Sequence, residues 1–474
     1  MNDFIQADLC IIGAGSGGLS IAAGASQLGL SVVLIEKGAM GGDCLNTGCV
    51  PSKALLAAAK RAHAHRLDNI AGISADVPLI DFGQVKDHVK GVIKTIEPHD
   101  SVERFEGLGV RVIQGVGTFV DRQTVVVNEQ RIQAKHFVIA TGSRASIPNI
   151  PGLDASRVLT HESLFDLVVA PDHLVIIGGG PVGIEMAQAH RRLGVSVTVI
   201  ERDQILHGHD REHVQPLREV LQSEGVVVHE NTHISQVTHH DKGATVYLEQ
   251  GDAIEASHLL VAAGRIPQTQ GLGLEAAGVA STEHGIISDA HLKTTNRRIF
   301  AVGDVSGGPL FTHAAGYQAG VVIKQVCFKM RWAKVSYNAL PRVTYTDPEM
   351  AQVGLTETDA KARFGDRIKV VSWDVADNDR AVAEGFRVGH IKVITDRKGK
   401  ILGVSLVGPG AGELLAPWTL AMSQGLKISA MAQVVAPYPT LGEISKRAAG
   451  SWYSPTLFSA KTKRLVRFLS KLPI

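Results

Sequence analysis

The stretch Ala7–Glu36, ADLCIIGAGSGGLSIAAGASQLGLSVVLIE, decides the fold. A short apolar run leads into a glycine loop, a helix of small residues follows, and a second apolar run ends at an acidic residue. Gly13 permits the tight turn, Gly15 lets the backbone approach a pyrophosphate, and Gly18 lets the helix pack against the strand. Glu36 is placed to bind a ribose hydroxyl. Because loop, helix and terminal acid coincide, the stretch predicts a dinucleotide-binding βαβ unit rather than an ordinary glycine turn.

The same order returns at residues 173–201. A strand over 173–177 precedes the loop GGGPVG, a helix over 184–193 follows, and a strand over 195–200 ends at an acidic residue. The residues that match the first unit are Gly178, Gly180, Gly183 and Glu201. Two such units predict two nucleotide-binding domains in one chain.

A cysteine pair follows closely after the first unit, in GGDCLNTGCVPSK. Cys44 and Cys49 have the spacing of half a metal site, but the sequence has no second cysteine pair to complete it, so no metal site is predicted. On one helical turn the two sulfurs can approach bonding distance. The positive end of a helix dipole would favour the thiolate of Cys49. We therefore predict a redox-active disulfide rather than a structural one.

The bulk composition is that of a soluble globular protein. The chain has 474 residues, of which 45% are hydrophobic and 20% charged, and this length predicts roughly two to four domains. A net charge of +2 gives no reason to expect nucleic acid as a partner. No secretory signal or membrane span is visible. Four scattered cysteines favour a cytoplasmic location, with Cys10 and Cys327 as small buried hydrophobes.

Further elements are expected between and after the two units. Helices are predicted over about 52–67 and 82–107. One apolar strand stops at Thr141 and Gly142, another at Gly264, and a third over 298–304 ends at Asp304. From about Ala339 strands and helices continue without a phosphate loop, which indicates a third domain. The last stretch, 460–474, is basic and amphipathic, and is predicted to form a surface or dimer-docking helix.

Several segments in the right order resemble the class I pyridine nucleotide–disulfide oxidoreductases. The strongest likeness is GGDCLNTGCVPSKAL, which resembles the family's active-site signature. The others are ATGSRASIPNIPG (140–152), AAGRIPQ (262–268), IFAVGDV (299–305) and TDPEMAQVGLTE (346–357). The resemblance covers essentially the whole chain. It implies an α/β fold in which two Rossmann-like domains are followed by a C-terminal α+β dimerisation domain.

The resemblance also implies domain bounds and cofactors. Residues 1–150 and 281–338 would bind FAD, residues 151–280 would bind NADH or NADPH, and residues 339–474 would form a homodimer. FAD would be held by the first glycine loop, Glu36, Thr141, Gly142 and Asp304. The helix that begins near Ala314 would point its positive end at the flavin. The nicotinamide nucleotide would be held by the second loop, Glu201 and Gly264, with Glu201 favouring NADH and the adjacent Arg202 favouring NADPH.

Catalytic roles follow from the same resemblance. Cys49 would be the thiolate next to the flavin, and Cys44 the thiol that meets the substrate. Lys53 and Glu185 would form an ion pair beside the flavin. His313, close to the flavin-facing helix start, needs no role of its own because the backbone would do the binding there.

The chain departs from the disulfide-reductase branch near its C-terminus. That branch has a His-Pro-Thr segment whose histidine accepts the substrate thiol proton, with a Glu shortly after. Here the segment has Tyr438 in place of the histidine, followed by Glu443, and no histidine occurs after His390. A phenol is only about one part in a thousand ionised at pH 7, whereas a positioned base contributes roughly 10²–10⁴ in rate.

The departure leaves three hypotheses open. The first is a dihydrolipoyl dehydrogenase-like oxidoreductase of a small disulfide or dithiol. The second is a mercuric-reductase-like reductase of metal ions or quinones, although mercuric reductases end in a vicinal cysteine pair and this sequence ends in SKLPI. The third is a flavoprotein scaffold without catalysis, which the complete electron path disfavours.

Overall fold

The computed structural model describes residues 4–65 and 78–473. By their contacts these residues fall into two compact units. Residues 4–63, 78–202 and 228–336 make the first, and residues 64–65, 203–227 and 337–473 make the second. The structure therefore groups 203–227 with the C-terminal unit, while the domain bounds expected from the sequence stay predictions. Residues 66–67, the end of one expected helix, lie outside the described residues.

The first unit is organised around a seven-stranded sheet in the order β3-β2-β1-β6-β5-β4, with β18 also paired to β6. Its parallel strands are β1 (Phe4–Ile12), β2 (Val32–Glu36), β3 (Val110–Gln114), β6 (Gln130–Ile139) and β18 (Ile299–Ala301). The strands β4 (Thr118–Phe119) and β5 (Thr124–Val127) continue it in antiparallel fashion. In the register Ile12 and Ala301 both lie beside Ile139. The carboxyl ends of β1, β6 and β18 therefore meet at one edge.

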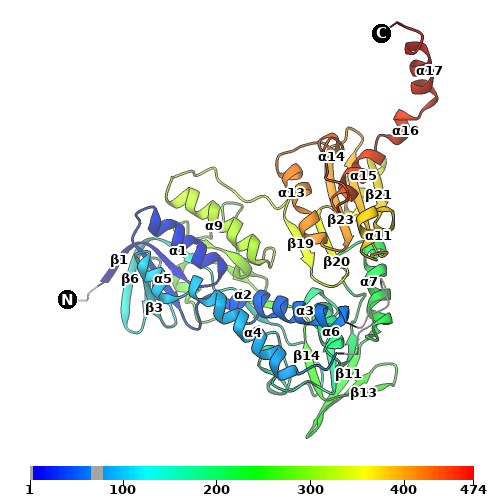
Figure 1. The fold of residues 1–474 in the computed structure, drawn as a ribbon. Coiled ribbons are helices and arrows are strands. Elements are labelled where there is room, and N and C mark those ends of the chain that lie inside the picture. The colour runs from blue at the N-terminus through cyan, green and yellow to red at the C-terminus, as the bar shows by residue number, and fades with distance from the viewer. Residues whose placement is uncertain (1–3, 66–77, 474) are drawn as a thin grey trace. The chain divides into compact units, whose positions relative to one another are not determined.

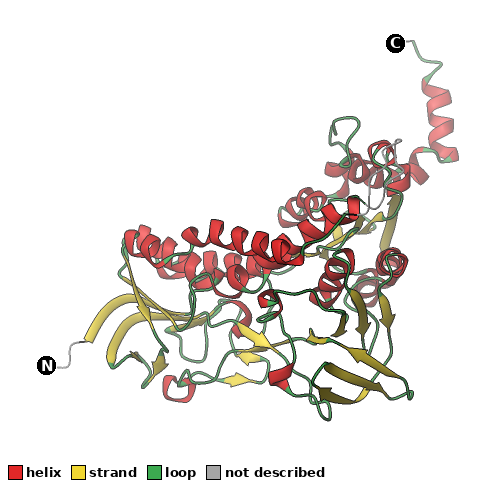
Figure 2. Cartoon of the chain, turned by 60° about the horizontal axis from the view of Figure 1, so that its bottom comes forward, coloured by secondary structure: helices red, strands yellow, loops and turns green. Residues whose placement is uncertain are grey.

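Two helices made largely of small residues, α1 (Ser16–Gln27) and α9 (Thr312–Val326), pack side by side in this unit (Figure 1). Figure 2 shows helices lying together on one face of the strands near the N-terminus. A Cβ on Gly24 would lie 2.5 Å from Cδ1 of Ile323, and one on Gly17 would lie 2.9 Å from Cγ1 of Val302. The glycines of α1 thus permit the close approach.

The helices after the cysteine segment are α2 (Gly42–Asn46), α3 (Cys49–Ala64), α4 (Phe82–Ile96) and α5 (Val102–Gly107). The helix expected over 82–107 is interrupted, because Pro98 lies in a short 3-10 turn and Ser101 caps α5 by accepting from the backbone N–H of Arg104.

The second glycine loop lies in a four-stranded sheet in the order β10-β9-β8-β14. Its elements are β8 (His173–Ile177), α6 (Pro181–Arg192), β9 (Ser196–Ile200), β10 (Val227–His229) and β14 (His258–Val261). A three-stranded sheet follows, with β11 (Ile234–His240), β12 (Gly243–Leu248) and β13 (Ala253–Ala256). The short pieces are β7 (Ser143–Ala145) with β15 (Arg265–Pro267), α8 (Leu274–Ala277), and β16 (Ser281–Thr282) with β17 (Gly285–Ile286). The mixed α/β class expected from the sequence is confirmed.

The second unit has a five-stranded antiparallel sheet in the order β19-β20-β23-β22-β21. The strands are β19 (Pro341–Thr344), β20 (Glu349–Gly354), β21 (Ile368–Asp374), β22 (His390–Asp396) and β23 (Ile401–Gly408). Its helices are α7 (Arg211–Ser223), α10 (Glu357–Phe364), α11 (Asp379–Ala383), α12 (Ala411–Leu414), α13 (Ala416–Ser423), α14 (Ile428–Ala432), α15 (Glu443–Ser451), α16 (Ser454–Leu457) and α17 (Ala460–Leu469). Trp418 is fully buried in the core, where its indole N–H donates to Ser445 Oγ at 2.9 Å.

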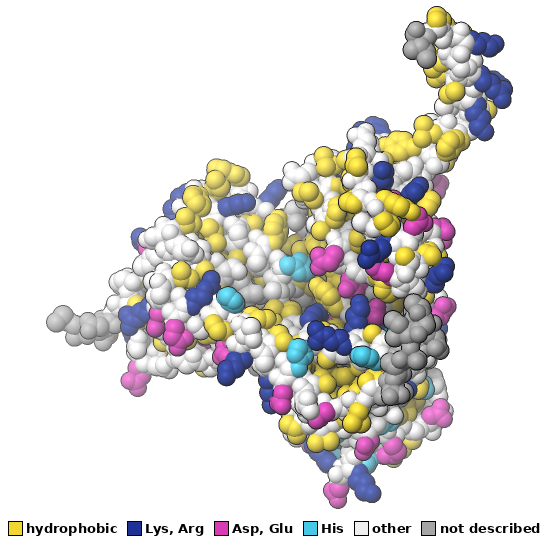
Figure 3. All heavy atoms as spheres, viewed as in Figure 1, with side chains coloured by type: hydrophobic (Ala, Val, Ile, Leu, Met, Phe, Trp, Pro, Cys, Tyr) yellow, Lys and Arg dark blue, Asp and Glu magenta, His cyan; other side chains and the backbone are white. Residues whose placement is uncertain are grey.

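The expected C-terminal helix is α17, and none of its residues is buried. Leu465, Val466, Phe468 and Leu469 are each at least half exposed. Figure 3 shows apolar side chains along one edge of this helix and basic ones along another. Whether this helix docks in a dimer stays a prediction. Among the helices of the described ranges, none is long and apolar enough to cross a membrane.

Candidate active site

The cysteine pair lies on two successive helices. Cys44 is in α2 and Cys49 is the first residue of α3. The expectation that both lie on one helical turn is therefore wrong. The chain turns at Gly48, where a Cβ would lie 2.9 Å from the carbonyl oxygen of Asp43. The sulfurs still lie within hydrogen-bonding reach of each other.

The two thiols have opposite acidities. The Cys44 thiol donates a hydrogen bond to Cys49, and this bond is the main reason why the pKa of Cys49 falls to about 6 while that of Cys44 rises. Burial opposes the charge on Cys49, but Thr312, whose Oγ1 lies 3.3 Å from its sulfur, and the positive charge of Lys53 favour it. The thiolate expected at Cys49 from its helix position thus has additional support from Thr312, which the sequence did not reveal.

Lys53 and Glu185 form the ion pair that the resemblance implied. Lys53 Nζ lies 2.9 Å from Glu185 Oε2. Lys53 comes from α3, one turn after Cys49, and Glu185 comes from α6, directly after the second glycine loop. Glu185 is buried whereas Lys53 is more than a third exposed. The ion pair therefore links α3, which carries Cys49, to α6, the helix that follows the second glycine loop.

A charged cluster beside the pair was not predicted from the sequence. The guanidinium of Arg265 forms an ion pair with Asp43, and Nε2 of His161 lies 3.2 Å from Asp43 Oδ1. Burial opposes the charge of Asp43, but His161 and Arg265 hold the pKa of its carboxyl well below the usual range. Arg265 also donates to Ser143 Oγ at 2.7 Å, which in turn donates to Asp304 Oδ2 at 2.6 Å. Arg265 directly follows Gly264, a residue that the sequence did single out.

The first glycine loop has the geometry that its sequence predicts. Gly13 has φ +106°, and a Cβ there would lie 2.4 Å from the carbonyl oxygen of Ala140. A Cβ on Gly18 would lie 1.9 Å from the carbonyl oxygen of Gly13. Glu36 accepts from the backbone N–H of Ala14 at 2.6 Å, so its carboxylate lies at the loop.

The second loop repeats this arrangement closely. Gly178 has φ +112°, a Cβ on Gly183 would lie 2.0 Å from the carbonyl oxygen of Gly178, and a Cβ on Gly180 would meet nothing within 4 Å. Glu201 Oε2 accepts from the backbone N–H of Gly179 at 2.6 Å. The first compact unit therefore contains two equivalent glycine loops, each with a carboxylate that accepts a hydrogen bond from the loop backbone.

The remaining residues expected to bind cofactor lie at turns and strand ends of the first unit. Thr141 Oγ1 donates to the carbonyl oxygen of Gln268 at 2.7 Å, which links the two small-residue turns. Gly142 and Gly264 have φ of +70° and +123°. Asp304 lies in the turn after β18, and Ala314 is buried in the first turn of α9.

The residues fit an anionic cofactor such as FAD. The helices α1 and α9 begin without a side-chain hydrogen bond to their first N–H groups, and such free ends attract phosphate or developing negative charge. A Cβ on Gly15, at the start of α1, would meet nothing within 4 Å. This open space is what the approach of a pyrophosphate to the backbone requires.

Tyr438 and Glu443 lie in the second unit. Tyr438 is 70% exposed, and its hydroxyl donates to Asp379 Oδ2 at 2.9 Å. This hydrogen bond raises the pKa of the phenol. Glu443 is the first residue of α15. Asp379 carried no pattern in the sequence that would have singled it out.

Comparisons with known proteins define the class. Residues 7–319 match the family described as pyridine nucleotide-disulphide oxidoreductase, and residues 340–449 match the dimerisation domain of that family. The chain belongs to the pyridine nucleotide–disulphide oxidoreductases and is an FAD-dependent enzyme of that family.

Individual relatives include two kinds of enzyme. The chain is 36% identical to a mercuric reductase of Streptomyces lividans over 94% of this chain and 96% of that protein. It is also 36% identical to a dihydrolipoyl dehydrogenase of Geobacillus stearothermophilus over 95% of this chain and 97% of that protein. A solved structure, the Cu(II) complex of the HOCl-induced flavoprotein disulfide reductase RclA from Escherichia coli, has a TM-score of 0.84 at 27% identity and covers 95% of this chain and 100% of its own.

Gly15→Ala is expected to lower the FAD content of the purified protein several-fold without unfolding it. The added methyl meets no atom of the chain within 4 Å, so the loss would report contact with the cofactor. The flavin absorbance per protein measures it. Gly91→Ala in α4, where the methyl is equally unopposed, is the control. Equal flavin content in both variants would contradict a pyrophosphate at this loop.

The thiolate of Cys49 in the reduced protein is expected to persist from neutral pH down to about 6 and to be lost below it, because its pKa is lowered to about 6. The ultraviolet absorbance of the thiolate, taken as the difference between the wild type and Cys49→Ser as the pH is varied, measures this transition. A midpoint above about 8, the ordinary range of a thiol, would show that Cys44, Thr312 and Lys53 do not stabilise the charge.

Proposed function

We propose that the enzyme oxidises NADH and uses the electrons to reduce a metal ion or quinone at the Cys44–Cys49 pair. The observation that carries the proposal is the hydrogen bond from Tyr438 to Asp379. It keeps a neutral phenol at the position where the disulfide reductases of the family have a histidine base. A metal ion that binds both sulfurs lowers the pKa of the Cys44 thiol by its own charge, so the thiol proton leaves to water and needs no such base.

The described residues have defined roles in this proposal. The first glycine loop, Glu36, Thr141–Gly142, Asp304 and the start of α9 near Ala314 hold FAD. The loop around Gly178, Gly180 and Gly183 holds the nicotinamide nucleotide with Glu201 and Gly264. Bound FAD carries electrons two at a time between the nicotinamide and the disulfide. The pair Lys53–Glu185 would lie beside the bound flavin, and Lys53 supports the negative charge of Cys49.

The electrons balance over one cycle. Oxidation of one NADH to NAD⁺ releases two electrons and one proton, and reduction of the disulfide converts it to the Cys44 thiol and the Cys49 thiolate. The high pKa of Cys44 and the low pKa of Cys49 hold that proton on Cys44. One Hg(II) or two Cu(II) ions then take two electrons, giving Hg(0) or two Cu(I), while the disulfide re-forms and the proton leaves.

The dimerisation domain completes the proposed site. We propose that the enzyme is a cytoplasmic homodimer in which Tyr438 and Glu443 face the redox pair of the partner subunit. In this position the phenol donates a hydrogen bond to Asp379 or to a ligand, and does not accept a proton from substrate.

Oxidation of a small dithiol such as dihydrolipoamide is the second candidate. Its support is the similarity to dihydrolipoyl dehydrogenases, which is as high as that to mercuric reductases. Steady-state assays with Hg(II), Cu(II), quinones, lipoamide and oxidised glutathione separate the two. Turnover of the metal ions or quinones at least tenfold above that of both disulfides supports the proposal, and the reverse ranking refutes it.

NADH is expected over NADPH as the electron donor. Glu201 lies at the end of β9 next to the second loop, where a carboxylate binds a free ribose 2′-hydroxyl and repels a 2′-phosphate. The ratio of kcat/KM with NADH to kcat/KM with NADPH measures the preference, and Glu201→Gln should lower this ratio. A wild-type ratio that favours NADPH by roughly tenfold or more would assign the decisive role to Arg202 instead.

Tyr438→His is expected to raise the rate of dihydrolipoamide oxidation by roughly tenfold or more at pH 7, because the histidine supplies a base with a pKa of about 6.5. Wild-type turnover should be weak at pH 7 and rise toward alkaline pH, since Asp379 keeps the phenol neutral and the substrate thiol must ionise alone. The pH–rate profiles of the wild type, Tyr438→His and the control Tyr438→Phe test this. Fast wild-type turnover at pH 7 without a gain in the histidine variant would show that another group transfers the proton.

A further inference from the structure

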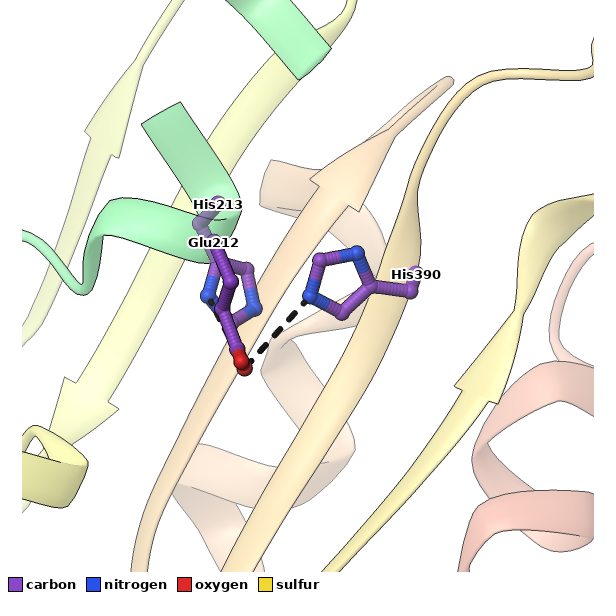
Figure 4. Close-up of side chains that lie close together, drawn as sticks. All are labelled: Glu212, His213 and His390. Atoms are coloured by element: carbon purple, nitrogen blue, oxygen red, sulfur yellow. Dashed lines mark ion pairs between the residues drawn. The ribbon is translucent and has the colours of Figure 1, made fainter. Parts of the chain in front are cut away.

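Three potential metal ligands lie together in the second unit, and none of them takes part in holding the cysteine pair. Glu212 and His213 are in the first turn of α7, and His390 is the first residue of β22. Figure 4 shows the two imidazole rings side by side with the carboxylate of Glu212 at their nitrogen-bearing edges. One donor atom from each residue lies within 4.8 Å of the other two.

The distances are close to those of a metal site. Glu212 Oε1 lies 3.7 Å from His390 Nε2 and 4.0 Å from His213 Nδ1. Both separations are too long for hydrogen bonds. Two ligands at about 2.1 Å from a tetrahedral ion lie roughly 3.4 Å apart. Small side-chain rotations therefore bring the three donors onto one ion.

His213 supplies an independent observation that points to a ligand. Its side chain is 2% exposed, and neither ring nitrogen has a hydrogen-bond partner of good geometry. Buried polar groups are nearly always bonded, and an orphaned one often marks an ion or water that binds there. The ring centroid lies 4.3 Å from that of His390 with the planes tilted by 39°, and both imidazoles lie near the same carboxylate.

Lys392 is a buried cation beside the cluster. It is 3% exposed and contacts Asp210 Oδ2 at 2.9 Å, Glu212 Oε1 at 2.5 Å and Glu357 Oε2 at 3.0 Å. One ammonium thus faces three carboxylates, of which Glu357 has a second cation in Lys361. Ligating carboxylates are usually held by such outer partners, and Lys392 holds Glu212 by the same oxygen, Oε1, that lies toward the two imidazoles.

We propose that Glu212, His213 and His390 bind a divalent transition-metal ion such as Zn²⁺. Two imidazoles and one carboxylate are a donor set typical of zinc, and oxygen-preferring ions such as Mg²⁺ and Ca²⁺ do not suit it. Glu212 is half exposed and His390 partly exposed, which leaves one side of the ion open to water. The ion joins the start of α7 to β22 and thereby ties residues 203–227 to the C-terminal sheet.

Zn²⁺ binding to the full-length, tag-free, FAD-loaded protein tests the proposal independently of turnover. The variant Cys44→Ser/Cys49→Ser serves as background so that no redox thiol competes for zinc. After chelator treatment, calorimetric titration should give one Zn²⁺ per chain, the thermal midpoint should rise with Zn²⁺, and X-ray absorption should show imidazole nitrogen ligands.

Three further variants in this background assign the ligands. His390→Ala and Glu212→Gln should each weaken binding at least about tenfold. Glu212→Gln keeps the side-chain volume at a half-exposed position, so it guards against misfolding. His284→Ala is the matched control, because His284 is exposed and lies 3.7 Å from Glu283 without a third ligand. Undetectable zinc binding in the background protein, equal affinity in all three variants, or sulfur ligands at the zinc would overturn the proposal.

Discussion

The parallel pairing of β1, β6 and β18 is the constraint on which the active site depends. It places Ile12, Ile139 and Ala301 in one row, so that the segments leaving these strands meet at the same edge of the sheet. Those segments are the first glycine loop, the turn at Thr141–Gly142 and the turn that contains Asp304. Three segments far apart in the chain thus come together through backbone hydrogen bonds alone, before any side chain takes part.

The redox pair depends on this edge for its electrostatics. Thr312, at the start of α9, contacts Cys49, and Arg265 joins Asp43 to Ser143 beside Asp304. Lys53 adds a positive charge on the same helix as Cys49, and buried Glu185 holds it. The hydrogen bond from Cys44 to Cys49 is the main cause that separates the two thiol pKa values, and Thr312 and Lys53 lower the pKa of Cys49 further. It assigns the thiolate to Cys49 and the proton to Cys44, which are the states that a two-electron relay requires.

The parts that could be predicted from the sequence are those set by local backbone geometry. Gly13 and Gly18 are required because a Cβ would collide with a carbonyl, and Glu36 and Glu201 end strands whose length is visible as apolar runs. The pairing of Lys53 with Glu185 was reached only through resemblance, since nothing local links the two residues.

Other contacts between distant segments could not be predicted. Arg265 and Asp43 are 222 positions apart, and no periodicity relates them. The turn at Gly48 was missed because the C-x4-C spacing also fits a continuous helix. Asp379, which determines the state of Tyr438, and the approach of His213 to His390 likewise depend on how strands and helices pack rather than on any pattern in the sequence.

The most direct test of the account is a count of thiols during anaerobic reduction by NADH. One equivalent of NADH should generate two new thiols per chain, which peptide mapping after alkylation should place at Cys44 and Cys49. Cys44→Ser should yield no new thiol and should lose turnover with every acceptor. Wild-type protein that turns over without forming these thiols, or a Cys44→Ser variant that keeps full activity, would contradict electron transfer through the pair.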